Sequence, residues 1–182
     1  MIFPAAAGAT KEWPVTNPSM GRALLWATAL TDCRDCLDLA DRLSRLPTSP
    51  GLLAVEARSA GRHLVRLAIV YFGQLYTPGY EDGSAVASNR HMTAELEQLE
   101  AEAFPHHFDL ARFQALKAVL LDLRHGTIAH ADGRAFRVEH DCNSARATTP
   151  ILDATLQAEF RGCCAKLILA LLRRAARIAE AP

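Results

Sequence analysis

The sequence has few aromatic residues, few lysines and no net charge. Aromatic residues make up 7% of the 182-residue chain, and 20 basic residues balance 20 acidic ones. A chain without net positive charge lacks the broad basic surface that attracts nucleic acid, although it can still carry a local basic site. Only 3 of the 20 basic residues are lysines. We interpret this preference for arginine as a coding bias rather than as selection for phosphate binding.

Long hydrophobic runs and paired cysteines are also missing. No stretch reaches the ~18 consecutive apolar residues of a membrane span. The 5 cysteines are an odd number, and residues 1–9 contain Pro4 and lack the basic start of a secretory leader. We therefore expect reduced thiols in a cytoplasmic protein that does not associate with membranes.

Half of the residues are hydrophobic, and most of these are small or aliphatic residues that suit close-packed helices. The prolines near the start predict an extended arm over residues 1–18, and the length of the rest fits one domain over residues 19–182. Apolar residues recur there at steps of three and four. We expect an all-α fold, an antiparallel helical bundle of four long helices plus a short one, with a weak strand pattern at 136–140.

The expected helices span about 17–45, 50–76, 89–103, 109–130 and 151–179. Each of the four long helices has an apolar stripe that predicts its inward face. The first stripe includes Leu25, Cys33 and Ala40, and the second includes Leu67 and Tyr71. The stripe of the helix at 109–130 is predicted at Phe113, Leu116, Leu120 and Leu123, widened by Val119 and Leu121. The stripe of the last helix is predicted at Leu152, Leu156, Phe160, Cys163, Leu167, Leu171, Ala175 and Ile178.

Two cysteines, Cys33 and Cys36, lie three residues apart and share one face of the first helix. A redox pair needs a lowered thiol pKa at a helix N-terminus, whereas this pair is mid-helix beside acidic residues. A zinc site needs further ligands, and the side chains of the adjacent His106 and His107 point apart. We favour core packing for the cysteines. A metal or thiol-redox role for these four residues is the alternative.

Arginines recur every four residues in the second helix, at Arg58, Arg62 and Arg66. Such a row is typical of a solvated helix face, and this is the interpretation that we favour. The alternative is a row of guanidinium groups that binds phosphates.

The segment from Leu121 to Asp132 places polar groups where the long fourth helix should be most buried. The apolar stripe of this helix, continued past Leu123, reaches Thr127 and His130. Burying such groups without partners costs about 1–3 kcal/mol each, so they pair with other helices or line a cleft. From composition alone, we favour a satisfied polar network made with Asp122, Arg124, His125 and Asp132.

Residues 124–130, Arg-His-Gly-Thr-Ile-Ala-His, resemble the signature of the HEPN superfamily: Arg, then Asn, Asp or His, then four variable residues and His. The wider run 123–132, which ends Ala-His-Ala-Asp, is similar to the bacterial branch found in abortive-infection and related defence proteins. The rest of the chain is compatible in the number and order of its helices.

The resemblance implies a metal-independent RNA endonuclease that needs no cofactor. His130 would act as general base on the RNA 2′-hydroxyl, and Arg124 would hold the phosphate that this hydroxyl attacks, leaving a 2′,3′-cyclic phosphate. His125 would orient the pair, with Thr127 and Asp132 in support. Such an enzyme would be a toxin or defence effector with a separate antitoxin protein. The alternative is a non-catalytic HEPN-like dimeric scaffold or nucleotide- or RNA-binding module.

Six residues on a straight helix separate Arg124 and His130 by about 9 Å along the axis and about 120° around it. The two side chains meet one phosphate only if they converge, if the helix distorts, for which Gly126 is a plausible place, or if a second chain contributes. Members of the superfamily commonly dimerise. We therefore expect a homodimer whose seam lies near this segment.

Overall fold

The computed structural model describes eight stretches of the chain: 18–46, 52–76, 80–81, 84–85, 89–125, 137–140, 145–148 and 152–180. Within them are five helices and two small antiparallel hairpins. The helices are α1 (Pro18–Ser44), α2 (Leu52–Gln74), α3 (Asn89–Ala103), α4 (His107–Leu123) and α5 (Ala154–Glu180). The hairpins pair β1 (Tyr80–Glu81) with β2 (Ser84–Ala85) and β3 (Arg137–His140) with β4 (Ala145–Thr148). The body of the protein is therefore all-α, as predicted.

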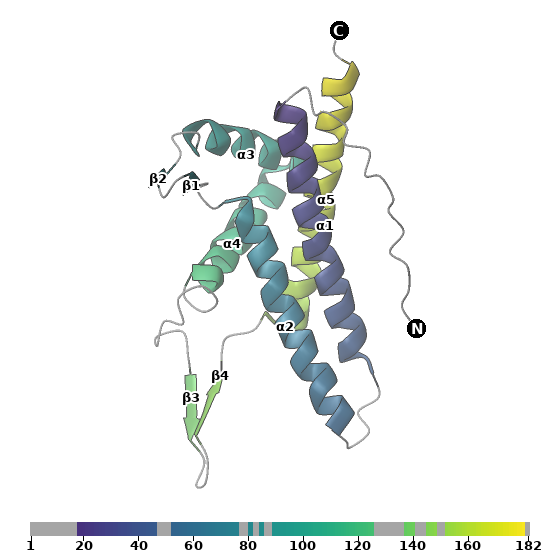
Figure 1. The fold of residues 1–182 in the computed structure, drawn as a ribbon, viewed down its shortest axis with the longest axis vertical. Helices are drawn as coiled ribbons and strands as arrows, with labels where there is room; N and C mark the ends of the chain where they lie inside the picture. Colours follow the sequence, from purple (N-terminus) through teal and green to yellow (C-terminus); the bar gives the residue numbers. More distant parts are fainter. Residues whose placement is uncertain are drawn as a thin grey trace, which may run out of the picture.

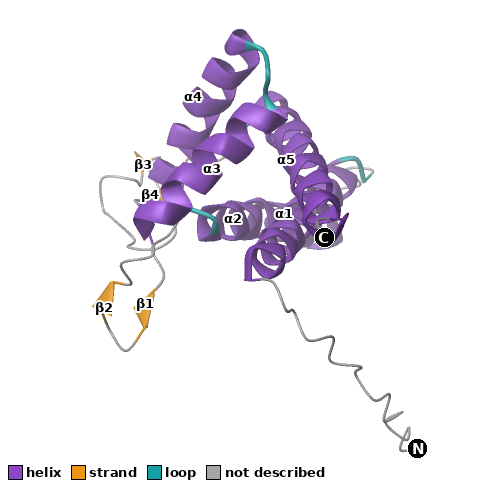
Figure 2. Ribbon diagram, turned by 90° about the horizontal axis from the view of Figure 1, so that it is seen from above, coloured by secondary structure: helices purple, strands orange, loops and turns teal. Residues whose placement is uncertain are grey.

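Three long helices form the centre of the molecule. The helices α1, α2 and α5 have 27, 23 and 27 residues and run along its long axis, with α1 packed against both others (Figure 1). The shorter helices α3 and α4 lie across this trio (Figure 2). The helix expected from 109 to 130 thus ends at Leu123 with 17 residues.

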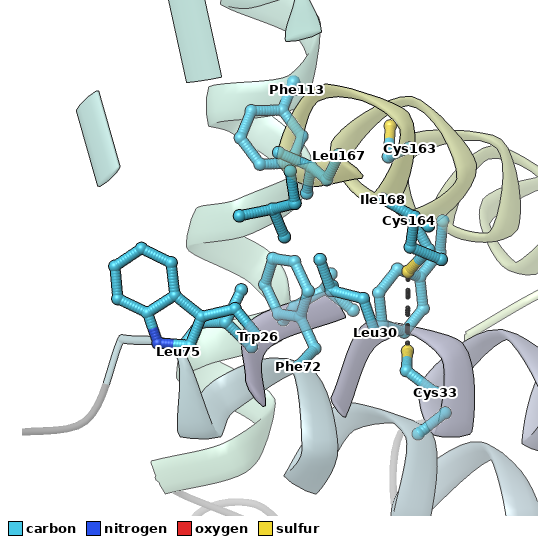
Figure 3. Packing of buried hydrophobic residues seen from close by; sticks show 14 of the residues in the cluster. Trp26, Leu30, Cys33, Phe72, Leu75, Phe113, Cys163, Cys164, Leu167 and Ile168 are labelled. Carbon is cyan, nitrogen blue, oxygen red and sulfur yellow. Dashed lines mark hydrogen bonds between the residues drawn. The ribbon is translucent and has the colours of Figure 1, made fainter. Parts of the chain in front are cut away.

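The core is built around Phe72 of α2. Its ring makes edge-on contacts with Phe160 of α5 and Phe113 of α4, with centroids 5.2 and 6.5 Å apart. Figure 3 shows Phe72 and Phe113 among the buried residues. Phe113 also stacks on Phe104 at 4.4 Å. Such aromatic pairs add about 0.5–1.5 kcal/mol each to the effect of burial. They fix α4 against α2 and α5, and so fix the direction in which α4 ends.

The predicted inward faces of α4 and α5 are largely confirmed. Phe113, Leu116 and Leu120 of α4 are buried, and Leu123 is partly buried against the core. The prediction that Val119 widens this face is wrong, because its side chain is 45% exposed. The buried residues of α5 include Leu152 just before it and Phe160, Cys163, Leu167, Leu171 and Ala175 within it.

The inward face of α1 agrees with the predicted one only in part, since Cys33 and Ala40 are buried as expected. Leu25 is 66% exposed, whereas Trp26, Leu30 and Leu37 are buried together with Cys33. Two apolar stripes run along this helix, and the 3.6-residue period fits both of them. The buried stripe is the one that carries Trp26, which packs in the hollow between α1, α3 and α5.

The second helix shows a smaller error of the same kind. Leu67 is 41% exposed, while Val65, Ile69 and Phe72 are buried. The expected arm differs by one residue, since Pro18 begins α1, and residues 1–17 lie outside the described part. No described helix has the length and hydropathy needed to span a membrane.

Candidate functional site

The HEPN-like motif begins where α4 ends. After Leu123 the backbone widens into a π-helical turn at Arg124 and His125. The Arg124 N–H is shared between the carbonyl oxygens of Leu120 and Leu121, and its φ and ψ of −62° and −48° stay helical. Single π-helical turns are frequent at functional sites. The Arg124 side chain leaves the backbone from this turn.

The Arg124 side chain lies directly against the backbone of Gly73 in α2. A Cβ atom added to Gly73 would stand 2.1 Å from Arg124 Cδ and 2.6 Å from its Nε. Any residue other than glycine would therefore displace the guanidinium. Gly73 is buried one residue before the end of α2, where the helix dipole presents negative charge to a cation. Sequence reasoning missed this residue, although an isolated glycine inside a helix often marks a close contact.

Seven of the described arginines form ion pairs with carboxylates, but Arg124 does not. Guanidinium groups pair with acidic side chains at Arg22, Arg34, Arg45, Arg112, Arg161, Arg174 and Arg177. Within the described residues no carboxylate forms an ion pair with Arg124, which is half-buried. The Arg124 charge is therefore available to bind a ligand or a residue outside the described stretches.

Of the other motif residues, the structure describes only His125. His125 is exposed at the widened turn. Thr127, His130 and Asp132 lie outside the described residues, as does Gly126, where we expected the distortion. The widening seen at Arg124 starts two residues earlier.

The predicted arginine row lies on α2. Arg58 and Arg62 are exposed, and Arg66 is half-buried. Arg58 and Arg62 line a cavity of about 230 Å³ that also involves Ser44 of α1 and Gln157 of α5. Gln157 is held by a hydrogen bond from its Nε2 to the Leu152 carbonyl at 2.6 Å.

A buried carboxylate that the sequence reasoning did not single out lies between α3 and α4. Glu100 is 1% exposed and accepts hydrogen bonds from Lys117 Nζ at 2.8 and 2.9 Å and from Gln114 Nε2. The Lys117 ammonium also lies 5.1 Å from the ring centre of Tyr76. The signal was present in the sequence, since Glu100 interrupts the apolar stripe of α3 and Lys117 that of α4. A charge on an inward stripe needs a partner of opposite sign.

The Tyr76 hydroxyl is buried beside this pair and has no hydrogen-bond partner among the described residues. Burial raises its pKa well above 10, and the nearby Glu100 charge adds to the effect although the two groups do not meet hydrogen-bond geometry. Tyr76 follows α2, and its N–H donates to the Gly73 carbonyl at 3.1 Å. The Glu100–Lys117 pair thus supports the end of α2 against which Arg124 lies.

The four cysteines that the structure describes belong to the core or pack against it. Cys33 and Cys164 are buried with their sulfur atoms 3.5 Å apart (Figure 3), and Cys36 is half-buried. Burial, followed by the contact with Cys164, raises the Cys33 pKa far above its ordinary value, which removes the reactive thiolate. His106 and His107 are exposed at the start of α4, and no group of three metal-ligating side chains occurs within the described ranges.

Comparisons of the chain with family models, with curated proteins and with solved structures give no significant match. Function therefore has to be inferred from the site itself.

Proposed function

We propose that the chain is a HEPN-like, metal-independent RNA endonuclease in which Arg124 binds the scissile phosphate. The observation that carries this proposal is the half-buried Arg124, which is positioned over Gly73 and has no carboxylate partner among the described residues. An arginine fork matches two phosphate oxygens. The motif supplies the second group, His130, six residues further along the chain.

The reaction needs only these groups and RNA. His130 takes the proton of a 2′-hydroxyl, whose oxygen attacks the adjacent phosphorus. The bond from phosphorus to the 5′-oxygen breaks, and that oxygen takes up a proton from water, to which His130 later returns its own. The products are a 2′,3′-cyclic phosphate and a 5′-hydroxyl. Arg124 stabilises the charge that builds up on the phosphate oxygens, and histidine suits the base role because its pKa lies near neutral pH.

The widened turn supports the pairing of Arg124 with His130. A straight helix would separate them by about 9 Å and about 120°, and a π-helical turn changes this register. We further propose a homodimer whose seam includes the end of α4, where a second copy would bring its own motif close. The exposed Val119 gives this end of α4 an apolar residue to bury.

We also propose a biological setting, a cytoplasmic toxin or defence effector that a separate protein restrains. Its support is the similarity of residues 123–132 to the defence branch of HEPN proteins. The described cysteines are all unbonded, which is consistent with a reducing compartment.

A second candidate function is a non-catalytic, dimeric HEPN-like module. One observation favours it. The Arg124 side chain packs against the last turn of α2, where a cation interacts favourably with the helix dipole by about 0.3–1 kcal/mol. In that case the arginine would serve the fold rather than a substrate.

Cleavage of a single-stranded RNA in EDTA, followed together with thermal unfolding, separates the two candidates. We expect Arg124→Ala and His130→Ala to lower the cleavage rate by about 100-fold or more while the melting temperature changes little. Arg173→Ala, which removes an exposed arginine from α5, is the control and should cleave normally. A lack of cleavage by the native chain, with a lowered melting temperature in Arg124→Ala, would favour the non-catalytic module.

A further inference from the structure

The helix α2 carries a row of arginines in a chain without net charge. This helix contains Arg58, Arg62 and Arg66 and a single acidic residue, Glu56. Arg58 and Arg62 are exposed. One arginine per turn places successive guanidinium stems about 6 Å apart along the axis.

The charges of Arg58 and Arg62 are not neutralised within the described residues. Neither forms an ion pair there, and no acidic side chain lines the 230 Å³ cavity between them and α1. The contrast is a larger cavity of about 540 Å³ between α1, α3 and α5. Its three arginines are paired with Glu95 and Glu102 at 2.9–3.1 Å.

The arginine row lies on the same side of α2 as Gly73, which the Arg124 side chain covers. Arg66 and Gly73 are seven residues apart, which is two helical turns, and so lie on the same face of α2. The Arg124 side chain covers that face at Gly73. Arg62 and Arg58 follow one and two turns further from Arg66. The distance from Arg58 to Gly73 along the axis is about 22 Å, which is enough for several nucleotides.

We infer that Arg58 and Arg62 bind the phosphates of a single-stranded RNA whose scissile phosphate lies at Arg124. The inference rests on the proposed function. The substrate is single-stranded because the attacking 2′-oxygen must lie in line with the bond from phosphorus to the leaving 5′-oxygen. Base pairing in a duplex keeps these two oxygens out of line. A local row of arginines provides the attraction that the neutral surface as a whole does not.

The test is a binding measurement with an RNA that cannot be cleaved. Fluorescence anisotropy of a labelled 2′-O-methyl 12-mer would be followed over a range of salt concentrations with the full chain. We expect the double variant R58A/R62A to bind about tenfold or more weakly, with a salt dependence shallower by about 1.4, because each contact to a single strand contributes about 0.7. The matched control R42A/R173A removes two exposed arginines from α1 and α5 and should bind as the native chain does.

Several outcomes would overturn the inference. One is equal binding by R58A/R62A and the native chain. Another is equal weakening of binding by both double variants. The third is a duplex of the same sequence, or inorganic phosphate, that competes as well as the unlabelled single strand does. Circular dichroism confirms that each variant is folded. If RNA binds through Arg58 and Arg62 but the native chain never cleaves an unmodified strand, the inference stands and the nuclease proposal fails.

Discussion

The Arg124 side chain occupies the position that a Cβ atom at Gly73 would take. A Cβ atom at Gly73 would lie 2.1 Å from Arg124 Cδ. This contact joins the end of α2 to the turn where the HEPN-like motif starts. It makes the orientation of the guanidinium, and not only its presence, a property that a substitution can change.

Gly73→Ala should therefore lower RNA cleavage without lowering stability. The added methyl group displaces the flexible end of Arg124, while alanine has a helix propensity better than that of glycine by about 1 kcal/mol. We expect a cleavage rate reduced by about tenfold or more, since small displacements of catalytic groups are costly. Cleavage and thermal unfolding would be measured side by side.

Gly61→Ala on the same helix is the control. A Cβ atom there meets the Ala40 carbonyl oxygen at 3.6 Å and Leu43 Cβ at 3.9 Å, which are ordinary contacts. Its cleavage rate should match that of the native chain. Equal rates in both glycine variants would show that the position of Arg124 is unimportant for the reaction.

The buried pair of Glu100 and Lys117 should dominate the electrostatic part of the stability. Lys117→Met leaves the Glu100 carboxylate buried without its cation, and we expect a loss of about 3 kcal/mol in the free energy of unfolding. Replacing Glu100 by Leu in the same chain should recover most of this loss, because no unpaired charge remains. Urea denaturation measures both effects.

Lys166→Met is the comparison for that prediction. Lys166 pairs with Asp109 at 3.2 Å, but both side chains are about half exposed, so the loss should stay below about 1 kcal/mol. A loss as large as that of Lys117→Met would contradict the importance given to burial.

The buried thiols predict a decline of stability in alkaline solution. Burial raises the pKa of Cys163 from 9.0 to about 11, and burial together with Cys164 raises that of Cys33 further. As pH rises above 9, the unfolded chain releases these protons first, so unfolding becomes more favourable by up to about 1.4 kcal/mol per pH unit and thiol. This part of the stability is complete below pH 9 and is lost towards the folded-state pKa values.

Urea midpoints at pH 8 and pH 10.5 check this sign. The variant with Cys33→Ala and Cys163→Ala should show a smaller drop between the two pH values, whatever its stability at pH 8. The same drop in the native chain and the variant would mean that other groups cause it. Below pH 9, Cys33 should also resist alkylation in the folded chain.

The sequence predicts the helices better than it predicts the faces that they bury. The inward face of α5 follows from its pattern because one stripe, from Phe160 to Ala175, is clearly more apolar than the rest. The pattern of α1 fits two stripes, and only packing against α2 and α5 selects the one with Trp26 over the one with Leu25.

The candidate site shows the same limit. The motif marks Arg124, but its contact with Gly73 joins two helices that are distant in sequence, and no periodicity within either helix reports on such a contact. The pairing of Glu100 with Lys117 is of the same kind. Each charge is visible as an interruption of an apolar stripe, while the partner depends on how α3 and α4 cross.

The most direct test of the central claim is the cleavage of single-stranded RNA in EDTA by the native chain and by Arg124→Ala, with the 3′ end of the product identified. We predict a 2′,3′-cyclic phosphate from the native chain and a rate lower by about 100-fold or more in the variant, at an unchanged melting temperature. Absence of cleavage by the native chain, or equal rates in the two proteins, would contradict it.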